Sequence, residues 1–362
     1  MRIAIVGAGI SGLATAFYLQ HMRHDCELVI YDANPLPGGT MRTIECDGFR
    51  FEAGGNGCRT NKPDSMRLVQ DAGAGHLLLP SSDLARKRYI FTDRLHRLPE
   101  SPPAFIASKL LSLPQKLRVA AEVFIPPKRD AGDESLQSFG YRRVGKAFTD
   151  IFLDAMTAGI YATTPDRISV NAAFPLVARL EQEHGGLFRG MLARRKRRAG
   201  PGGTLMSFKG GVGRFITHLQ DGLQADWRLG LPVTAILAGG GGYRILTTRD
   251  EDAVEQVVLA APAPAAADML AGLDAELAAR LASIDYSPIA VVGFGYWHLE
   301  QLLDGFGLLT TTAAGLPILG VLWDSSIFAD RAPAGARSLR VLIGGQRNPE
   351  LARQDEAGLI AT

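Results

Sequence analysis

The chain has 362 residues, of which 46% are hydrophobic and 21% are charged, and its formal net charge is +2. These values are typical of an ordinary globular protein of two or three domains, and so small a net charge implies no partner by itself. The three cysteines, Cys26, Cys46 and Cys58, form no C-x-x-C motif, which argues against a disulfide framework or a zinc site and fits a reducing cytoplasm. No apolar run reaches the ~18 residues that a membrane-spanning helix needs.

The first residues contain the pattern of a dinucleotide-binding unit. Residues 2–6 predict a strand, residues 13–23 predict a helix, and residues 27–31 predict a second strand that ends at Asp32. Between the first strand and the helix, Gly7 permits a tight turn, Gly9 lets the backbone approach a pyrophosphate, and Gly12 allows close packing of helix and strand. The helix N-terminus favours phosphate, and Asp32 can accept a hydrogen bond from a ribose 2′-OH, which argues against a 2′-phosphorylated cofactor.

A second glycine turn, Gly38-Gly39, follows Asp32 and favours a flavin over a nicotinamide dinucleotide. It can close on the same diphosphate from the other side. The segment DANPLPGGTMRT at residues 32–43 resembles the FAD signature of the flavin amine oxidase superfamily. That signature has Glu at its first position and usually Arg at its fifth, where this chain has Asp32 and Leu36. Arg42 is a candidate replacement for the missing cation.

The rest of the chain contains regions with different predicted secondary structure. Residues 208–271 return to strand and helix patterns, with a hairpin across residues 239–242 and a buried parallel strand at 254–259. Residues 95–200 predict helices, and four β-rich runs, at 289–296, 307–311, 318–323 and 338–344, predict an antiparallel sheet that forms the floor of a substrate cavity. We therefore expect an α/β fold in which a discontinuous Rossmann-like FAD-binding domain accompanies an antiparallel β substrate-binding sheet and an inserted helical subdomain. The expected boundaries are 1–75 and 201–284 for FAD, 76–98 and 285–350 for substrate, and 99–200 for the helices.

The central part of the chain resembles the flavin-dependent protoporphyrinogen oxidases of the flavin amine oxidase superfamily. The similarity covers essentially the whole chain and is carried by FEAGGN at 51–56, KRYI at 87–90, SPPAF at 101–105, TAGIY at 157–161, GFG at 305–307, LGVLWDSS at 319–326 and IGG at 343–345. Family chains continue past residue 362, and the predicted helix that begins near Leu351 ends the sequence without a closing strand. We expect that a C-terminal FAD segment is missing and that activity suffers.

The resemblance implies a set of site residues. Arg88 corresponds to an arginine that pairs with a propionate of the tetrapyrrole, where the alternative is a solvated basic edge shared with Arg86 and Lys87. Gly159 corresponds to a glycine that faces the reacting ring. Leu309, Leu322 and Leu342 correspond to apolar positions that sandwich the macrocycle, where the alternative is ordinary core. The expected cofactor contacts are Gly7, Gly9, Ser11, Gly12, Asp32, Gly38, Gly39, Arg42, Asn56 and Val233.

The chemistry that the resemblance implies needs no catalytic side chain. Hydride passes from a bridging carbon of the porphyrinogen to the flavin, molecular oxygen reoxidises the flavin, and the protein supplies orientation and a dry cavity. The substrate class is therefore a tetrapyrrole, with protoporphyrinogen IX expected and coproporphyrinogen III as the rival. The chain could instead be a generic flavin amine oxidase or an inactive truncated remnant, and a homodimer is left open. No metal site is expected.

The helical region also predicts a membrane-facing surface. Apolar helical stretches at 104–113 and 117–125 precede a basic cluster, which consists of Arg189, Arg194, Arg195, Lys196, Arg197 and Arg198. An apolar surface with nearby cations is typical of proteins that lie on anionic membranes. The alternative is a solvated loop between ordinary helices. A single basic run without an aromatic platform is not a nucleic-acid site. We expect a cytoplasmic protein with a peripheral membrane face.

Overall fold

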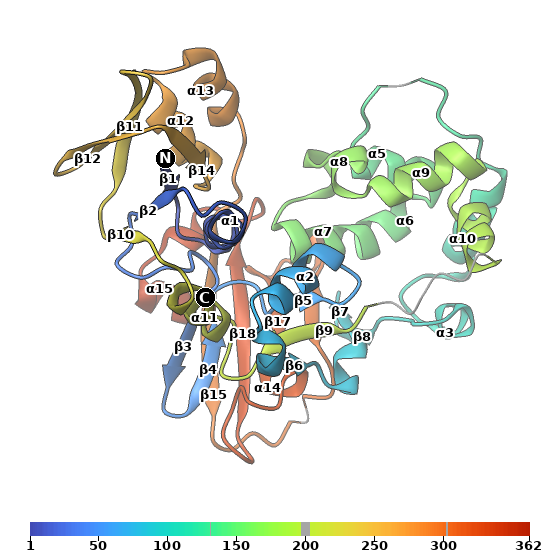
Figure 1. The fold of residues 1–362 in the computed structure, drawn as a ribbon. Coiled ribbons are helices and arrows are strands. Elements are labelled where there is room, and N and C mark those ends of the chain that lie inside the picture. The colour runs from blue at the N-terminus through green and yellow to red at the C-terminus, as the bar shows by residue number, and fades with distance from the viewer. Residues whose placement is uncertain (131, 197–202, 302) are drawn as a thin grey trace. The chain divides into compact units, whose positions relative to one another are not determined.

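The chain forms two compact units in a computed structural model that describes residues 1–130, 132–196, 203–301 and 303–362 (Figure 1). Unit 1 consists of Met1–Ser81 and Gly203–Tyr286, and unit 2 consists of Ser82–Gly202 and Ser287–Thr362. The side chains of residues 194–196 are also outside the description. Each unit is built from segments that are distant in the sequence, and the finer division into FAD, substrate and helical parts stays a prediction.

Unit 1 is centred on a four-stranded parallel sheet in the order β10-β2-β1-β14. The strands are β10 (Asp226–Leu229), β2 (Glu27–Asp32), β1 (Arg2–Val6) and β14 (Gln256–Leu259). Helix α1 (Ile10–Met22) follows β1 directly and begins three residues earlier than the sequence pattern predicted. This arrangement confirms the expected Rossmann-like part of the fold, because parallel strands with a helix after the glycine turn define it.

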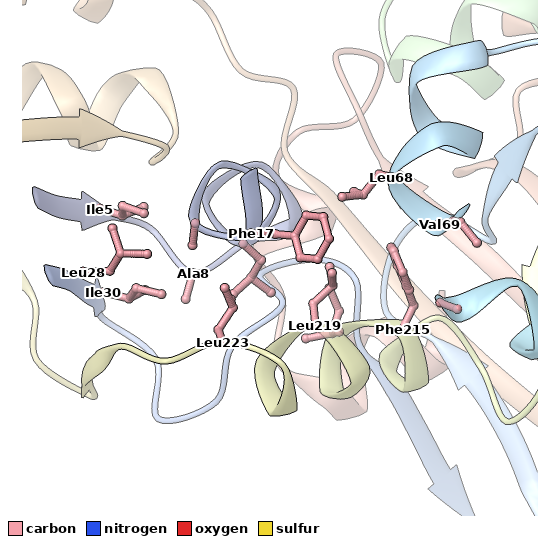
Figure 2. Close-up of a cluster of buried hydrophobic side chains, with 14 of the residues drawn as sticks. Ile5, Ala8, Phe17, Leu28, Ile30, Leu68, Val69, Phe215, Leu219 and Leu223 are labelled. Atoms are coloured by element: carbon pink, nitrogen blue, oxygen red, sulfur yellow. The ribbon is translucent and has the colours of Figure 1, made fainter. Parts of the chain in front are cut away.

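A buried apolar core lies between this sheet and the helices that cover it (Figure 2). Ile5 of β1 and Ile30 of β2 belong to one buried cluster with Phe17 of α1 and Leu219 of α11 (Gly213–Asp221). Leu219 is 1% exposed, and Phe215 lies one helical turn before it on the same buried face. Burial of side chains of this size stabilises the unit by about 1.5–3 kcal/mol each, which fixes α1 and its glycine turn against the sheet.

Smaller elements complete unit 1. The predicted hairpin across the four glycines is confirmed, because β11 (Val233–Gly239) and β12 (Gly242–Thr247) pair as antiparallel strands. The predicted strand at 254–259 starts too early: the β13 strand (Glu251–Val254) pairs with β12, and the chain switches to the parallel sheet at Glu255, whose carboxylate accepts a hydrogen bond from the Arg2 amide. The remaining elements are β3 (Thr43–Cys46), β4 (Phe49–Glu52), β5 (Cys58–Arg59), α2 (Pro63–Asp71), η1 (Ala74–Leu77), β6 (Leu78–Pro80), β9 (Leu205–Phe208), α12 (Ala263–Leu270) and α13 (Ala275–Ala282).

Unit 2 contains a six-stranded sheet in the order β15-β18-β17-β16-β7-β8. The strands are β15 (Ile289–Tyr296), β18 (Arg337–Gly344), β17 (Ile318–Leu322), β16 (Gly307–Thr310), β7 (Tyr89–Phe91) and β8 (Leu95–Arg97). All four β-rich runs predicted from the sequence are strands of this sheet. These four strands pair with one another in antiparallel fashion, as predicted, and β7 adds to β16 as a parallel strand. The segment that leads into β7 lies beside the segment that leads into β16, although the two are far apart in the sequence. The Phe306 amide donates a hydrogen bond to the Lys87 carbonyl oxygen at 2.8 Å.

The helices of unit 2 between residues 102 and 196 confirm the prediction that residues 95–200 are mostly helical. The helical elements of unit 2 are η2 (Asp83–Arg86), α3 (Pro102–Ala107), α4 (Leu113–Ala120), η3 (Ala121–Phe124), α5 (Leu136–Arg143), α6 (Lys146–Phe148), the π-helical turn η4 (Thr149–Leu153), α7 (Asp154–Tyr161), η5 (Pro165–Arg167), α8 (Val170–Ala173), α9 (Pro175–His184), α10 (Leu187–Lys196), η6 (Thr312–Ala314), α14 (Asp324–Ile327), η7 (Leu351–Arg353) and α15 (Glu356–Ala361). Throughout the part of the chain that the structure describes, no helix is both long and apolar enough to cross a membrane.

Candidate functional site

Two glycine turns lie side by side at the end of the parallel sheet in unit 1. Gly7, with φ of +111°, follows β1, and Gly38, with φ of +115°, follows β2. The turns are joined by the Gly38 amide, which donates to the Ala8 carbonyl oxygen at 2.8 Å. A Cβ atom at position 7 would lie 2.7 Å from the Ala260 carbonyl oxygen, and one at position 12 would lie 1.9 Å from the Gly7 oxygen. The protein itself therefore requires glycine at both positions.

Gly9 differs from these glycines, because a Cβ atom built on it meets no protein atom within 4 Å. Gly9 is the N-cap residue of α1, where no side chain caps the helix and no acidic residue occupies the first turn. The first amides of a helix need acceptors, and they form a site that favours phosphate when the protein supplies none. The open space beside Gly9 is thus suited to a diphosphate that approaches the bare backbone.

The carboxylate of Asp32 connects the end of β2 with the first glycine turn. Its Oδ2 accepts a hydrogen bond from the Ala8 amide at 2.8 Å, and its Oδ1 accepts one from the Asn34 amide at 2.8 Å. Oδ1 also accepts a hydrogen bond from the Asn34 side-chain amide at 3.0 Å, whereas Oδ2 keeps a second lone pair that can accept a hydrogen bond from a ligand hydroxyl. Asp32 is therefore held in place by the backbone and still suited to bind a ribose.

A cavity of about 760 Å³ opens over these residues. Seven of the ten predicted cofactor residues line it, namely Gly7, Gly9, Ser11, Asp32, Gly38, Gly39 and Val233. Gly12 lies beneath the turn, whereas Arg42 and Asn56 are not among the lining residues, so the cation role proposed for Arg42 stays a prediction. The bare backbone, the uncapped helix and the anchored carboxylate together fit the diphosphate and ribose of FAD.

The same cavity has lining residues that the sequence pattern did not indicate. The segment at 260–262 follows β14, and Tyr31 is the residue before Asp32 on β2. The position of the 260–262 segment could have been inferred from the sequence, because the carboxyl ends of adjacent parallel strands meet at one edge of a sheet. The Tyr31 hydroxyl donates to Asp252 at 2.7 Å, and burial together with that carboxylate raises the pKa of Tyr31. Tyr31 therefore stays protonated at neutral pH.

In unit 2, the three predicted macrocycle leucines lie on one face of the sheet. Leu309 of β16 and Leu342 of β18 both pair with Gly320 of β17, and residues opposite each other in a sheet point to the same side. Leu322 lies two residues after Gly320 on the same strand and therefore shares that face. All three leucines are half-buried, as expected for a surface that has some contact with a ligand.

Gly159 lies against this face from α7. A Cβ atom at position 159 would lie 2.4 Å from Leu309 Cδ2, so only glycine permits this approach of the helix to the strand. Gly320 serves the same packing from the sheet, where a Cβ atom would lie 2.9 Å from Leu309 Cδ2. The structure thus brings Gly159 together with the leucine row.

Arg88 lies one residue before β7, and its guanidinium stacks over the Phe306 ring at 5.3 Å from the ring centroid. The flanking cations have acidic partners: Lys87 Nζ lies 2.6 Å from Asp304, and Arg86 lies 3.3 Å from Asp83. Arg88 is exposed, and the strand that it leads into is in register with Leu309. A guanidinium held in this way is suited to bidentate binding of a carboxylate.

The described residues contain no cluster of three or more His, Cys, Asp or Glu side chains that is placed to hold a metal ion. The model of the flavin containing amine oxidoreductase family matches residues 10–361. The chain belongs to this family. It is therefore an oxidoreductase with a flavin cofactor, and FAD, predicted from the two glycine turns, is confirmed.

Within the flavin amine oxidoreductases, the chain is similar to porphyrinogen oxidases. It is 28% identical to the coproporphyrinogen III oxidase of Bacillus subtilis (strain 168), over 95% of this chain and 77% of that protein. It is 29% identical to the chloroplastic protoporphyrinogen oxidase of Oryza sativa subsp. japonica, over 98% of this chain and 72% of that protein. A crystal structure from Exiguobacterium sp. 255-15, provisionally described as a protoporphyrinogen oxidase, superposes with a TM-score of 0.87 at 25% identity, over 99% of this chain and 80% of that one.

Proposed function

We propose that the protein oxidises protoporphyrinogen IX to protoporphyrin IX with molecular oxygen as electron acceptor, in haem and porphyrin biosynthesis. The observation that carries the proposal is the row of Leu309 and Leu342 on one sheet face, with the Gly159 backbone packed against it. A row of apolar side chains on one sheet face suits a tetrapyrrole, whose bulk is a wide hydrophobic ring system. Bound FAD supplies the hydride-accepting chemistry of each two-electron step.

The side chains of this site bind and orient the substrate. The leucines exclude water from one face of the macrocycle, and their contact area contributes most of the affinity. Arg88 binds a propionate through charge-assisted hydrogen bonds and sets the rotation of the ring about its axis. Because the leucine row contains no group that accepts or donates protons, it supplies orientation and leaves electron transfer to the cofactor.

Coproporphyrinogen III is the second candidate, and the Bacillus subtilis relative supports it. This substrate carries four carboxylates in place of two. The described basic residues around the sheet do not favour the additional pair, because acids already neutralise three of them. Lys87 pairs with Asp304, while Arg340 and Arg347 are buried beside Asp324 and Asp154, respectively. We therefore propose protoporphyrinogen IX as the preferred substrate.

Side-by-side initial rates test this preference. The FAD-loaded chain is mixed with each porphyrinogen, and the fluorescence of the aromatic product is followed against a protein-free control. The proposal predicts a higher kcat/KM for protoporphyrinogen IX. A higher kcat/KM for coproporphyrinogen III would assign the rival substrate. Oxidation of simple amines with neither porphyrinogen consumed would instead assign a generic amine oxidase, and no turnover of any of them would indicate an inactive chain.

We also propose that the helical part of unit 2 contacts a membrane surface. Four large apolar side chains on α3, α4 and η3 are strongly exposed: Ile106 at 70%, Leu113 at 70%, Leu117 at 62% and Phe124 at 83%. Exposed large apolar side chains on three successive helical elements support an interaction site. Of the predicted basic cluster, Arg189 is described, whereas the side chains of Arg194, Arg195 and Lys196 and the whole of Arg197 and Arg198 lie outside the described residues.

A further inference from the structure

A buried ion pair holds the first residue of α7. Asp154 and Arg347 approach to 2.9 Å, and their side chains are only 8% and 7% exposed. Asp154 Oδ2 also accepts a hydrogen bond from the Thr312 amide at 2.6 Å, and Oδ1 accepts one from the Thr312 hydroxyl at 2.9 Å. Burial of two charges is costly unless their geometry and hydrogen bonds are good, so this arrangement strongly restricts where α7 can begin.

Arg347 extends the restraint to the end of β16. Its guanidinium donates to the Thr310 carbonyl oxygen at 2.9 Å, and Thr310 is fully buried. Thr310 directly follows Leu309 in the strand. A single guanidinium thus joins the start of α7 to the residue next to the central leucine of the proposed substrate face.

The C-terminal end of α7 is held by Gln346, the residue before Arg347. The Gln346 amide donates to the carbonyl oxygen of Ala162, the residue after the helix, at 2.8 Å. Gly345 makes this approach possible, because its φ is +65° and a Cβ atom there would lie 2.5 Å from the same oxygen. Residues 346 and 347 therefore hold both ends of α7, and Gly159 lies between them.

We infer that the Asp154–Arg347 pair is a positioning element of the substrate site, an inference that rests on the proposed function. It fixes α7 on β16 so that the Gly159 backbone meets Leu309, and it thereby sets the level at which a tetrapyrrole lies on the leucine face. Neither residue belongs to the predicted substrate contacts. Their effect on binding passes through the helix.

Other ion pairs of unit 2 lie within its helical region and form their hydrogen bonds away from α7 and β16, so they offer a control. Arg143 and Glu122 are both fully buried, and the hydrogen bonds of these two side chains reach Ile125, Pro126 and residues 185, 187 and 188. The adjacent Arg142 is more accessible and bonds to Glu134 and Glu181. Loss of the Arg142 contacts should lower stability within the helices without moving α7 on the sheet. The Arg142→Met variant is therefore the control.

Equilibrium binding of protoporphyrin IX to the FAD-loaded chain tests the inference without relying on turnover. Arg347→Met should raise the porphyrin Kd by about threefold to thirtyfold, whereas Arg142→Met should lower the melting temperature and leave the Kd unchanged. Arg347→Lys keeps the charge but not the fork that reaches both Asp154 and Thr310, so its Kd should be intermediate. This variant also serves if Arg347→Met does not fold.

A double-mutant cycle separates positioning from general destabilisation. Gly159→Ala adds a methyl group against Leu309 and should weaken porphyrin binding in the parent. In the Arg347→Met or Arg347→Lys background the helix can move away, so the same methyl should cost less. Additive effects, or parent-like Kd values for both Arg347 variants, would overturn the inference while leaving the proposed function intact. Absence of porphyrin binding by the parent chain would contradict both.

Discussion

The Asp32 carboxylate accepts the amide hydrogen of Ala8 at 2.8 Å and so joins the end of β2 to the turn that follows β1. This bond places an acid of the cofactor cavity beside the glycine turn. The second oxygen is held by the Asn34 amide, so the carboxylate cannot rotate freely. A ligand hydroxyl therefore meets an acceptor that has already lost its rotational entropy on folding.

Asp32→Ala should weaken FAD binding by about 1.5–3 kcal/mol, which corresponds to roughly 10–150-fold in Kd, because a charge-assisted hydrogen bond to the ribose is lost. Flavin fluorescence titration of the apoprotein measures the change. Asp250→Asn, a change at an acid of unit 1 that does not line the cavity, should bind FAD as the parent does. Equal affinity of the Asp32→Ala variant and the parent would remove Asp32 from the cofactor site.

Gly12→Ala should lower the stability of the protein, whereas Gly9→Ala should lower its affinity for FAD. A methyl at position 12 overlaps the Gly7 oxygen and should lower the thermal stability of the apoprotein, with a cost of about 1–3 kcal/mol or more. A methyl at position 9 meets no protein atom, so the apoprotein should remain as stable as the parent while FAD affinity falls. Calorimetry of the apoproteins and flavin titration check the pair. Unchanged FAD affinity of Gly9→Ala would show that the diphosphate does not approach this turn.

Arg88→Ala should weaken porphyrinogen binding by about 1.5–3 kcal/mol for each charge-assisted hydrogen bond and leave the flavin absorption spectrum unchanged. The Michaelis constants for protoporphyrinogen and coproporphyrinogen measure the effect. Arg86→Ala is the matched control, because Arg86 is a neighbouring exposed arginine that pairs with Asp83. If Arg88→Ala changes neither Michaelis constant, Arg88 is part of a solvated basic edge and has no role in the site.

Binding to anionic liposomes should depend on the exposed apolar side chains of α3, α4 and η3. The parent protein should sediment with the vesicles at low ionic strength, and added salt should release part of it. Phe124→Ser should reduce the bound fraction, whereas Leu316→Ser, a change at a partly exposed apolar residue elsewhere in unit 2, should not. Parent protein that stays in the supernatant would contradict the membrane proposal.

The cofactor site of unit 1 was predictable because its signals are local. The glycines at 7, 9 and 12 and the acid at 32 lie within one strand-helix-strand segment, where spacing alone determines which atoms meet. The hairpin at residues 239–242 was predictable for the same reason. The first turn of α1 was missed because the predicted start followed the apolar run, although the helix already includes Ile10 beside the glycines.

The proposed substrate site of unit 2 depends on contacts between segments that are distant in the sequence. No local pattern places β7 parallel to β16, since these strands are joined by more than two hundred residues. The Asp154–Arg347 pair is separated to a similar extent, and neither residue lies in a recognisable motif. The row of leucines was named only through a family resemblance, because leucines in strands are usually core. Their shared face is a consequence of strand register, which the sequence does not specify on its own.

Oxidation of a porphyrinogen by this flavin amine oxidoreductase can be measured directly. The most direct measurement adds protoporphyrinogen IX to the FAD-loaded chain in oxygenated buffer and follows protoporphyrin fluorescence and hydrogen peroxide together, with the FAD-free chain and free FAD as controls. Porphyrin should form faster with the FAD-loaded chain than in both controls, and hydrogen peroxide should rise in constant proportion to it. Porphyrin formation at the same rate with the FAD-loaded chain and with free FAD would contradict the proposed function.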